Sequence, residues 1–513
     1  MVTFEEFETL SRTYNVIPFV RSLLADMHTP VLTYLTLRQE GASSFLFETV
    51  EPDEKIGRYS FVGVDPVLSV RENARGVEIR RGSETRTGAG DIFQALGALS
   101  KEYRQAPLPA GKDVNGADNR IQAGLQGGFV GYLGYNAIRH IEKVPIPPHG
   151  PDRTDESRFD LFLSIVRFDH RLQTLMIIHN VVIDPVLPLK EQYERGRQAV
   201  DTLELRLRRS PVGVQQFVCD PALAEEGTDR ASFCRLVERA KKYIFEGDIF
   251  QVVLSRRIRL RYSGDLFPVY RALRVINPSP YLFFVDFGPA TLVGSSPEVL
   301  VRVQNGMVDV LPIAGTRKRG RTEEEDLRLE HDLLQDDKEL AEHVMLVDLG
   351  RNDVGRICDY GTVEVPVLKR VDRYSHVMHI VSHVRGRLRS GMSALDALKS
   401  CFPAGTVSGA PKVRAMEIIS ELEGSSRGFY AGAVGYLGLN GSLDTCIAIR
   451  TIFADGEVLT IQAGAGVVAD SIPENEYEET VNKSRAMLDA VRRAARGLGQ
   501  PGFHGDTIVP RGT

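Results

Sequence analysis

The stretch Lys338-Glu339-Leu340-Ala341-Glu342-His343-Val344-Met345-Leu346-Val347-Asp348-Leu349-Gly350-Arg351-Asn352-Asp353 carries the first strong pattern in this chain. Apolar residues recur at intervals of three, four and seven from just before this stretch into it, at Leu333, Leu334, Leu340, Val344 and Val347. No Gly or Pro interrupts them before Gly350. This spacing predicts a helix. On that helix Glu339 and Glu342 project from one face, because they are three residues apart. Taken alone, such a pair is more often a solvated acidic edge than a binding site.

A second acidic cluster opens a helix that we predict near the C-terminus. Ser471 and Glu474 have the spacing of a capping box. Glu476, Glu479 and Lys483 then fall on one face of the helix. Two helices that each offer a pair of carboxylates can hold a hard divalent cation without His or Cys. Because Mg²⁺ takes one or two carboxylates and completes its shell with water and anionic substrate oxygens, the pattern predicts a Mg²⁺ site that presents an anionic substrate.

The composition is that of an ordinary globular protein with two to four domains. The chain has 513 residues, of which 42% are hydrophobic and 26% charged, and a net charge of −5. The mild charge and the lack of a long basic run argue against nucleic acid as a partner. No apolar run is long enough to span a membrane, and the first residues are acidic rather than those of a signal peptide. Five scattered cysteines without a C-x-x-C motif favour reduced thiols in the cytoplasm.

Changes in pattern divide the chain into four parts. Residues 1–209 are predicted to form an N-terminal α+β domain with an antiparallel sheet. Residues 210–229 break the pattern and are interpreted as a linker, although a long connector within one domain would look the same. Residues 230–497 form the second predicted domain, and 498–513 a flexible tail.

Several elements are predicted with definite bounds. Val31–Leu37 is predicted to be a strand, and residues 443–453 one continuous strand. Asn440-Gly441 and Asp455-Gly456 are hairpin signals between apolar runs.

Six segments of the second half, taken in order, resemble the chorismate-utilising enzymes. They cover roughly residues 225–495. The segments are Gly294-Ser-Ser-Pro-Glu298, Pro312-Ile-Ala-Gly-Thr316, residues 338–353, Asp372-Arg-Tyr-Ser-His-Val-Met-His379, Phe402-Pro-Ala-Gly-Thr-Val-Ser-Gly-Ala-Pro-Lys412, and Gln462-Ala-Gly-Ala-Gly466 followed by Glu476, Glu479 and Lys483. The resemblance implies an α+β fold with two large antiparallel sheets packed together and flanked by helices. It also implies that 230–497 is a chorismate-binding catalytic domain and 1–209 a regulatory one.

Within this family the chain most resembles the large, chorismate-binding components of anthranilate synthases. Ala314 stands where aminodeoxychorismate synthases usually carry a Lys nucleophile, and Gln251 stands where isochorismate and salicylate synthases carry the Lys that activates water. The resemblance therefore implies conversion of chorismate and ammonia to anthranilate and pyruvate, the first committed step of tryptophan biosynthesis. Two alternatives stay open: an aminodeoxychorismate synthase component I, and a non-catalytic tryptophan-binding regulator on the same scaffold.

The resemblance also assigns residues to the reaction. Glu298 is expected to protonate the leaving hydroxyl, His379 to relay a proton during loss of pyruvate, and Gln251 to complete the catalytic group. Mg²⁺ is expected on Glu342 and Glu479, with Glu339 and Glu476 bonded to its waters. The residues expected to bind the substrate are Gly315, Thr316, Thr406, Tyr430, Arg450, Gly464, Ala465, Gly466 and Lys483.

Two further segments resemble the walls of the family's tryptophan feedback site. One is Phe45-Leu-Phe-Glu-Thr49 with Lys55, and the other runs through Asn277-Pro-Ser-Pro280-Tyr281-Leu282. The inhibitor residues expected from them are Glu48, Thr49, Lys55, Pro280, Tyr281 and Leu282. Phe45–Thr49 alone would read as a half-buried strand, and it is the presence of both walls that favours the binding site.

The chain lacks the nucleophilic-cysteine turn of a glutamine amidotransferase. Ammonia is therefore expected from solution or from a separate glutaminase subunit, the second component of such a synthase. The resemblance implies a heterotetramer of two large and two small subunits.

Overall fold

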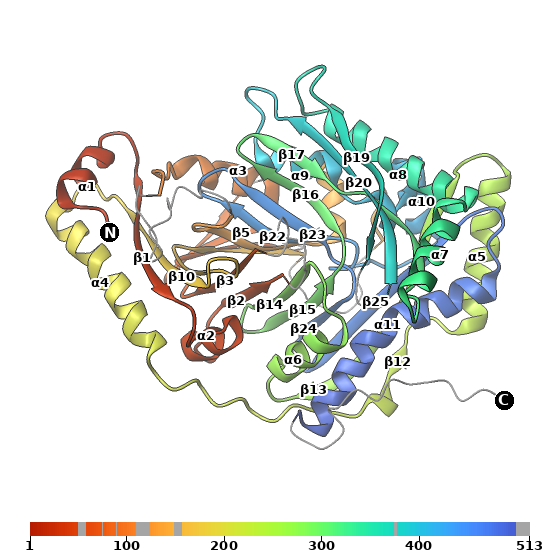
Figure 1. The fold of residues 1–513 in the computed structure, drawn as a ribbon, viewed down its shortest axis with the longest axis horizontal. Helices are drawn as coiled ribbons and strands as arrows, with labels where there is room; N and C mark the ends of the chain where they lie inside the picture. Colours follow the sequence, from red (N-terminus) through yellow and green to blue (C-terminus); the bar gives the residue numbers. More distant parts are fainter. Residues whose placement is uncertain are drawn as a thin grey trace.

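The computed structural model describes residues 1–49, 58–73, 75–88, 90–108, 124–147, 156–373 and 377–498, without the side chain of Thr316. Two large antiparallel sheets lie face to face, and helices flank them (Figure 1). This confirms the predicted fold class. Lys55 and residues 499–513 lie outside the described part. No helix in the described part is long and apolar enough to cross a membrane.

The first sheet joins both halves of the chain. Its central strands, in spatial order, are β1 (Val16–Leu24), β10 (Thr174–Val182), β9 (Ser164–Asp169), β3 (Tyr59–Val64), β2 (Ser44–Glu48), β14 (Tyr281–Asp286), β15 (Ala290–Ser296), β24 (Thr451–Asp455), β25 (Val458–Val467), β13 (Gln251–Ser263) and β11 (Val218–Cys219), and β12 (Glu225–Glu226) and β21 (Gly409–Ala410) also pair with β13.

The second sheet also takes strands from both halves of the chain. Its strands, in spatial order, are β18 (Ile313–Lys318), β20 (Val377–Arg387), β17 (Met307–Val310), β16 (Val299–Gln304), β23 (Leu443–Ile447), β22 (Ala433–Gly438), β7 (Gly128–Leu133), β8 (Ser157–Phe162), β4 (Leu68–Asn73), β5 (Gly76–Arg81) and β6 (Glu84–Gly88), with β19 (Glu364–Arg373) paired to β20.

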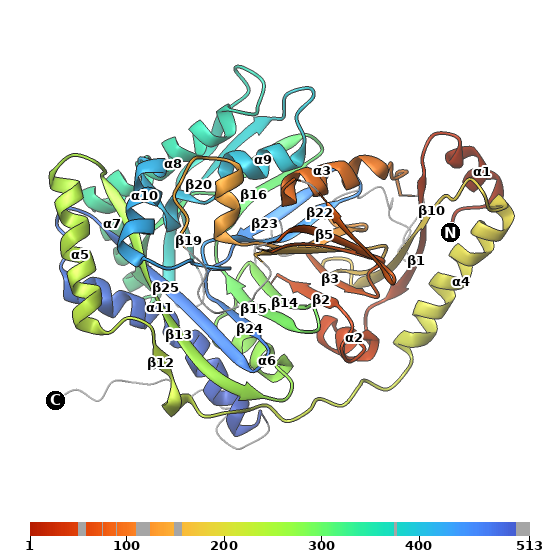
Figure 2. The same cartoon turned by 180° about the vertical axis from the view of Figure 1, so that it is seen from behind.

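Helices cover the outer faces and gather at one end. The helices are α1 (Phe4–Ser11), α2 (Pro30–Leu37), α3 (Ile92–Glu102), α4 (Leu189–Leu207), α5 (Arg230–Phe245), α6 (Phe267–Ile276), α7 (Glu323–Leu334), α8 (Asp337–Gly355), α9 (Ala394–Cys401), α10 (Lys412–Glu423) and α11 (Pro473–Arg496), with 3₁₀ turns η1 (Tyr135–His140), η2 (Pro221–Leu223) and η3 (Gly405–Val407). In Figure 1, α4 lies at the left edge, whereas α5, α7, α8 and α10 cluster at the right. From behind, α3 and α9 lie together over the second sheet (Figure 2).

Both sheets cross the expected boundary at residues 210–229. In the first sheet β2 pairs with β14, so that Glu48 lies opposite Leu282. In the second sheet β7 pairs with β22, so that Leu133 lies opposite Ala433. The ranges 1–209 and 230–497 therefore share their hydrogen-bonded frameworks.

Aromatic rings fill the space between the two sheets. Phe45 of β2 meets Phe162 of β8 edge to face, with ring centroids 4.8 Å apart. Phe61 of β3 similarly meets Tyr436 of β22 at 6.1 Å. These side chains belong to one buried cluster that takes residues from both sheets. Since burial of large apolar side chains is the main stabilising term in folding, this layer fixes how the strand ends of one sheet face those of the other.

Several predicted elements are wrong in detail. The helix predicted from Leu333 onward is two helices, because Asp336 caps α8 by accepting hydrogen bonds from the backbone amides of Lys338 and Glu339. Residues 31–37 are helical rather than a strand, since Thr29 caps α2 and Pro30 occupies its first turn. At the other end of the chain, the expected capping box is absent: the Ser471 hydroxyl accepts from the Val468 amide instead of capping α11.

The predicted strand at 443–453 is also two strands, in different sheets. β23 ends at Ile447 in the second sheet, and β24 begins at Thr451 in the first. Both hairpin signals are confirmed, since β22 turns into β23 at Asn440-Gly441 and β24 into β25 at Asp455-Gly456. The short link between the sheets contains Arg450, whose φ of 51° lies in the left-handed region. Such a backbone conformation is costly for a residue with a side chain and is often found at functional sites.

Candidate active site

Acidic side chains of α8 and α11 lie near each other, since the charges of Glu479 and Lys483 act on Glu342. Glu342 of α8 approaches Gln251 at the start of β13, with Gln251 Nε2 3.4 Å from its Oε1. On α11, Lys483 Nζ lies 2.6 Å from Glu479 Oε1 and 3.1 Å from the Gly464 carbonyl oxygen of β25. Residues far apart in the sequence are thereby brought to one place.

Glu298 lies in the tight link between β15 and β16. The Thr406 hydroxyl, from η3, donates a 2.9 Å hydrogen bond to its Oε1. Burial raises the pKa of Glu298 to about 7, although the Thr406 bond and the charge of Lys483 lower it. A carboxyl with such a pKa is still substantially protonated near neutrality, so it can serve as a general acid.

A recess of about 390 Å³, counted with its open mouth, adjoins Glu298. Its lining combines apolar side chains from β16, β17 and α8 with Thr406 at one side and Asp353 at another. Asp353 is paired with Lys412 at 2.8 Å. The Glu298 carboxyl is therefore screened from bulk water by mostly apolar walls, which accounts for its raised pKa.

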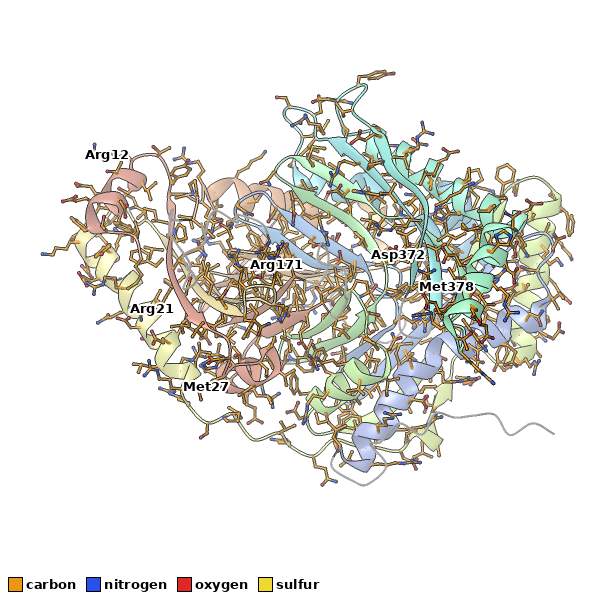
Figure 3. All side chains as sticks on the ribbon, in the orientation of Figure 1. Arg12, Arg21, Met27, Arg171, Asp372 and Met378 are labelled. Atoms are coloured by element: carbon orange, nitrogen blue, oxygen red, sulfur yellow. The ribbon has the colours of Figure 1, made fainter. Side chains whose placement is uncertain are left out.

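His379 lies on β20 beside Thr316 of β18. Its Nδ1 is 3.1 Å from the Gly315 carbonyl oxygen, so in the neutral ring Nδ1 carries the proton and Nε2 the lone pair. Burial lowers the pKa of His379, and the charge of Arg450 lowers it further. The ring is thus an acceptor at neutral pH. In Figure 3, Met378 and Asp372 mark the neighbouring positions on β20 and β19.

Arg450 and Tyr430 form a cationic corner of the site. Arg450 Nη1 donates to the Lys483 carbonyl at 3.1 Å. Burial lowers the pKa of Arg450, while Tyr430 and Glu479 act in the opposite direction. Burial also raises the pKa of Tyr430 to about 12, so its hydroxyl stays a donor. A guanidinium and a phenol in this arrangement can bind a carboxylate.

Glycines let the backbone of β25 approach these groups. A Cβ added to Gly464 would lie 2.5 Å from the Tyr430 hydroxyl oxygen, and one added to Gly466 would lie 2.8 Å from Gln251 Nε2. Ala465 between them is fully buried. Gly315 on β18 has a φ of 70°, which favours glycine.

The four acidic residues predicted to hold Mg²⁺ come from α8 and α11. Burial raises the pKa of Glu342, and the nearby charges of Glu339 and Glu479 raise it further. Burial also raises the pKa of Glu476; a hydrogen bond with Ser471 lowers it, and the charge of Glu479 raises it further. Within the described residues no three His, Cys, Asp or Glu side chains are gathered as a ready metal site. Two carboxylates with water and substrate oxygens are, however, what Mg²⁺ commonly takes, and a cation would relieve the repulsion.

Comparison with known proteins gives the chain its family. A model of the chorismate binding enzymes matches residues 68–489. The chain belongs to the chorismate-binding enzyme family. Anthranilate synthase component 1 of Acetivibrio thermocellus is 44% identical over 501 residues, 96% of this chain and 98% of the relative. The protein of that name from Pseudomonas aeruginosa is 44% identical over 504 residues, 96% and 99% of the two chains.

Solved structures of chorismate-binding enzymes share the fold. The crystal structure of anthranilate synthase component I from Streptococcus pneumoniae matches with a TM-score of 0.72 and 35% identity, over 91% of this chain and 99% of that one. The menaquinone-specific isochorismate synthase of Escherichia coli matches with a TM-score of 0.67 over 94% and 98% of the chains. At 20% identity the second match shows the fold alone.

Other histidines of this chorismate-binding enzyme are engaged away from the site. His343 on α8 is fully buried, and its Nε2 lies 2.6 Å from the Ser382 hydroxyl. His383 pairs with Asp309 at 2.6 Å. The first contact holds α8 against β20, and the second holds β17 against β20.

The residues expected at the tryptophan site fall on both faces of the first sheet. Glu48 and Leu282 are opposite each other across β2 and β14 and share one face. There the buried Glu48 carboxylate accepts hydrogen bonds from Tyr270 and from Arg274, the latter at 3.0 Å. Pro280 is buried, and Thr49 directly follows β2.

Tyr281 lies on the opposite face of β14 from Leu282, because side chains alternate along a strand. Its hydroxyl donates to Asp444 Oδ1 at 2.6 Å, inside the layer between the sheets. Tyr281 and Leu282 therefore do not line one pocket.

Sequence reasoning missed two arginines that belong to this site. Arg317 on β18 holds Glu339 at 3.2 Å and Asp336 at 2.6 Å, so Glu339 is already paired with a cation where Mg²⁺ was predicted. Arg427, between α10 and Tyr430, is fully buried and bonded to Glu423. Glu423, four residues before Arg427, was the available signal, but the other two partners of Arg427 are the backbone carbonyls of Val407 and Val253, which no side-chain pattern marks.

Proposed function

We propose that the chain is the chorismate-converting component of an anthranilate synthase, which makes anthranilate and pyruvate from chorismate and ammonia for tryptophan biosynthesis. The observation that carries this is Glu298, a carboxyl with a pKa near 7 held by Thr406. The alternative nucleophile positions lack lysine: Ala314 lies on β18 beside Gly315, and Gln251 faces Glu342. With no amine of its own at these positions, the site suits an external ammonia.

In the first step ammonia adds at C2 of chorismate and the C4 hydroxyl leaves. Hydroxide is a poor leaving group, so Glu298 protonates it and water departs. Arg450 and Tyr430 bind one substrate carboxylate. Gly464 and Gly315 have no side chain in the way, so the other carboxylate can come close to the backbone there. Lys483 adds a positive charge from α11.

In the second step the amino adduct loses pyruvate and the ring becomes aromatic. His379 takes the ring proton on Nε2 while Nδ1 remains bonded to the Gly315 carbonyl, a role that this bond supports by leaving Nε2 as the acceptor. A proton returned to the enolpyruvyl group releases pyruvate. The orientation imposed by Gly315 keeps the lone pair directed away from the backbone.

Mg²⁺ would be held by Glu342 and Glu479, with Glu339 and Glu476 bonded to its water ligands. When bound, it supplies Lewis acidity and charge neutralisation for a substrate carboxylate. The chain's own residues then orient the substrate around it. Arg317 keeps Glu339 in place, and Gln251 holds Glu342.

Two further features belong to this proposal. Component 1 of a synthase implies a companion, and we propose a glutamine amidotransferase that supplies ammonia, in an assembly of two large and two small subunits. We also propose feedback inhibition by L-tryptophan near Glu48, Thr49 and Leu282. Because this region joins strands from both halves of the chain, a ligand there can favour one arrangement of the sheets over another.

Incubating the protein with chorismate, Mg²⁺ and an ammonium salt at mildly alkaline pH tests the function. Anthranilate fluorescence should appear together with an equal amount of pyruvate. A 4-amino product without pyruvate would support an aminodeoxychorismate synthase instead. Tryptophan binding with no chorismate turnover would support a regulator, and a Glu298→Gln variant supplies the inactive control.

A further inference from the structure

Arg427 is one of the largest side chains fully buried in the protein. Its guanidinium forms a bidentate pair with Glu423, with Nε–Oε2 at 2.9 Å and Nη2–Oε1 at 2.7 Å. It also donates to two backbone carbonyls, of Val407 and of Val253, each at 2.7 Å. One side chain therefore ties together α10, η3 and β13.

Each of these contacts lies next to a residue of the proposed site. Val407 follows Thr406, whose hydroxyl donates to the Glu298 carboxyl. Val253 is two residues beyond Gln251 on β13. The guanidinium carbon also lies 5.5 Å from the centroid of the Tyr430 ring, with the Tyr135 ring at 5.0 Å.

Glu423 is fixed independently of Arg427. Its Oε1 accepts from both the amide and the hydroxyl of Ser255, each at 2.8 Å. Gln462 of β25 in turn donates to the Ser255 hydroxyl at 2.8 Å. The pair is thus built into the first sheet and cannot move without it.

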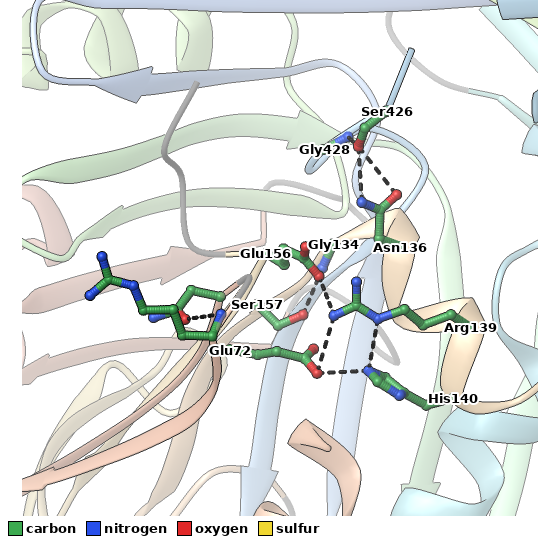
Figure 4. Close-up of polar contacts among 11 residues, drawn as sticks. Glu72, Gly134, Asn136, Arg139, His140, Glu156, Ser157, Ser426 and Gly428 are labelled. Carbon is green, nitrogen blue, oxygen red and sulfur yellow. Dashed lines mark hydrogen bonds and ion pairs between the residues drawn. The ribbon is translucent and has the colours of Figure 1, made fainter. Parts of the chain in front are cut away.

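The segment that carries Arg427 is anchored from the other half of the chain. Asn136 of η1 donates to the Ser426 hydroxyl at 3.0 Å, and the Tyr135 amide donates to the Gly428 carbonyl at 2.8 Å. Figure 4 shows Asn136 bonded to Ser426, whose hydroxyl also accepts from the Gly428 amide, beside the ion pairs of Arg139 with Glu72 and Glu156. The residues on either side of Arg427 are therefore held in place.

A buried ion pair contributes little net stability, because desolvation of both charges offsets their attraction. An apolar pair of similar volume would fill the same space. The geometry around Arg427 instead matches the demand for a planar fork that bonds a carboxylate and two carbonyls at once, which lysine cannot supply.

We propose that Arg427 is a positioning residue of the active site, which with Glu423 holds the η3 turn so that Thr406 stays bonded to the Glu298 carboxyl. Arg427 acts through Thr406 and does not touch the substrate. This inference rests on the proposed function, because its main measurement is turnover of chorismate.

The ionisable groups that lie around Glu298 could also contribute to the pH dependence of kcat. They are Lys483 from α11, Asp353 of α8 with its partner Lys412, and Cys401 at the end of α9. Arg427 is not among the charges that act on Glu298. The guanidinium of Arg427 bonds Glu423 and the Val407 and Val253 carbonyls rather than Glu298, and Val407 is the residue through which it reaches Thr406.

The test compares Arg427→Lys, Thr406→Val and the double variant, each measured as kcat against pH at a constant concentration of free ammonia. Loss of the Thr406 hydrogen bond favours the protonated carboxyl, so Thr406→Val should move the alkaline limb upward by about one pH unit, a tenfold change in proton binding. Arg427→Lys should move it in the same direction, and the double variant no further than Thr406→Val. Arg302→Lys is the matched control, since Arg302 pairs with Asp444 inside the core; its limb should not move.

If Arg427→Lys does not fold, Glu423→Gln replaces it, because the amide oxygen still accepts one bond while the fork is broken. A variant that lowers Tm but leaves the alkaline limb unchanged would overturn the positioning role. Additive shifts in the double variant would overturn it as well. Absence of turnover in the wild type would instead contradict the proposed function, and crystal structures of wild type and Arg427→Lys would then decide the question through the Thr406–Glu298 distance.

Discussion

The Thr406 hydroxyl donates to Oε1 of Glu298 across the gap between η3 and the β15–β16 link. The resemblance assigned Thr406 to the substrate, whereas in the structure it bonds the proposed acid. Because a hydroxyl donor stabilises the carboxylate more than the acid, this contact opposes the burial that raises the pKa of Glu298. The balance between them sets the pH range of the reaction.

Turnover should depend on the protonated form of Glu298. At constant free ammonia, kcat should be highest below the pKa of about 7 and fall as pH rises through it, and bound dianionic substrate should move this limb upward. Glu298→Gln should lower kcat by at least a hundredfold. A Glu298→Gln enzyme with wild-type rates and the same limb would contradict the assignment.

The raised pKa of Glu298 should also make the free energy of unfolding depend on pH. The folded pKa of about 7 lies above the ordinary value of 4.5, so its stabilising contribution is complete below pH 4.5 and lost as pH rises to about 7. Thermal unfolding of the wild type and Glu298→Gln should therefore diverge over that range in favour of the variant. The difference should be at most on the order of 3 kcal/mol. Parallel curves would mean that Glu298 ionises normally.

Replacing either carboxylate proposed to bind Mg²⁺ should abolish Mg²⁺ binding and leave the protein folded. Glu342→Gln and Glu479→Gln should abolish turnover at ordinary Mg²⁺ concentrations, because each removes a hard oxygen ligand. Without substrate, Mg²⁺ should raise the Tm of the wild type and not of these variants. Asp489→Asn is the control, since this exposed acid on α11 pairs with Arg492. Full activity in EDTA would exclude the metal.

His379 should serve the second step only. His379→Ala or His379→Met should form the amino adduct but lose pyruvate at least a hundredfold more slowly, because the proton acceptor is gone. Product analysis by chromatography would detect the accumulated adduct. His383→Gln, four residues along β20, should release anthranilate and pyruvate in equal amounts. An adduct-free, inactive His379 variant would contradict the role.

Tryptophan inhibition should depend on the end of β2. Thr49→Phe should keep chorismate turnover but lose inhibition, because the larger side chain fills the space beside Glu48. Binding can be followed by the fluorescence of the ligand, since the chain contains no Trp. Equal inhibition of both proteins, or inhibition that chorismate relieves by competing for one site, would exclude a separate site here.

Gly464→Ala should weaken substrate binding without unfolding the protein. The new methyl group would lie 2.5 Å from the Tyr430 oxygen and 2.9 Å from the Leu254 carbonyl oxygen, so the phenol must move. We expect KM to rise about tenfold and the free energy of unfolding to fall by about 1–3 kcal/mol. Gly441→Ala, at an open turn of positive φ, is a control for backbone strain alone. An unchanged KM would separate Tyr430 from the substrate.

Local patterns predicted some elements and not others, for physical reasons. α5 begins at Arg230, the first residue of the second predicted domain, because its apolar face and its Asp229 cap agree. The break before α8 was missed, since Asp336 is compatible with a helix interior unless its side chain turns to cap the next one. The division of residues 443–453 between two sheets was missed for a different reason: both strands are apolar, and only tertiary packing decides which sheet each one joins.

The site was predicted through resemblance more than through pattern. Spacing alone indicated the acidic faces of Glu339 with Glu342 and of Glu476 with Glu479. It gave no reason to single out Glu298, which lies in a short link between strands. Arg427 was missed by both approaches, because an Arg four residues after Glu423 looks like an ordinary surface ion pair, and its burial depends on the distant carbonyls of Val407 and Val253.

The pairing of β2 with β14 has a consequence for how the protein is made. Glu48 and Leu282 are paired across two neighbouring strands although more than two hundred residues separate them in sequence. In the same way, Leu133 pairs with Ala433, which is synthesised much later. On a ribosome the first half would emerge with unpaired strand edges long before their partners are synthesised. Such high contact order slows folding and exposes edges that aggregate. We therefore expect chaperone dependence during synthesis, and insolubility of a fragment that ends near residue 209.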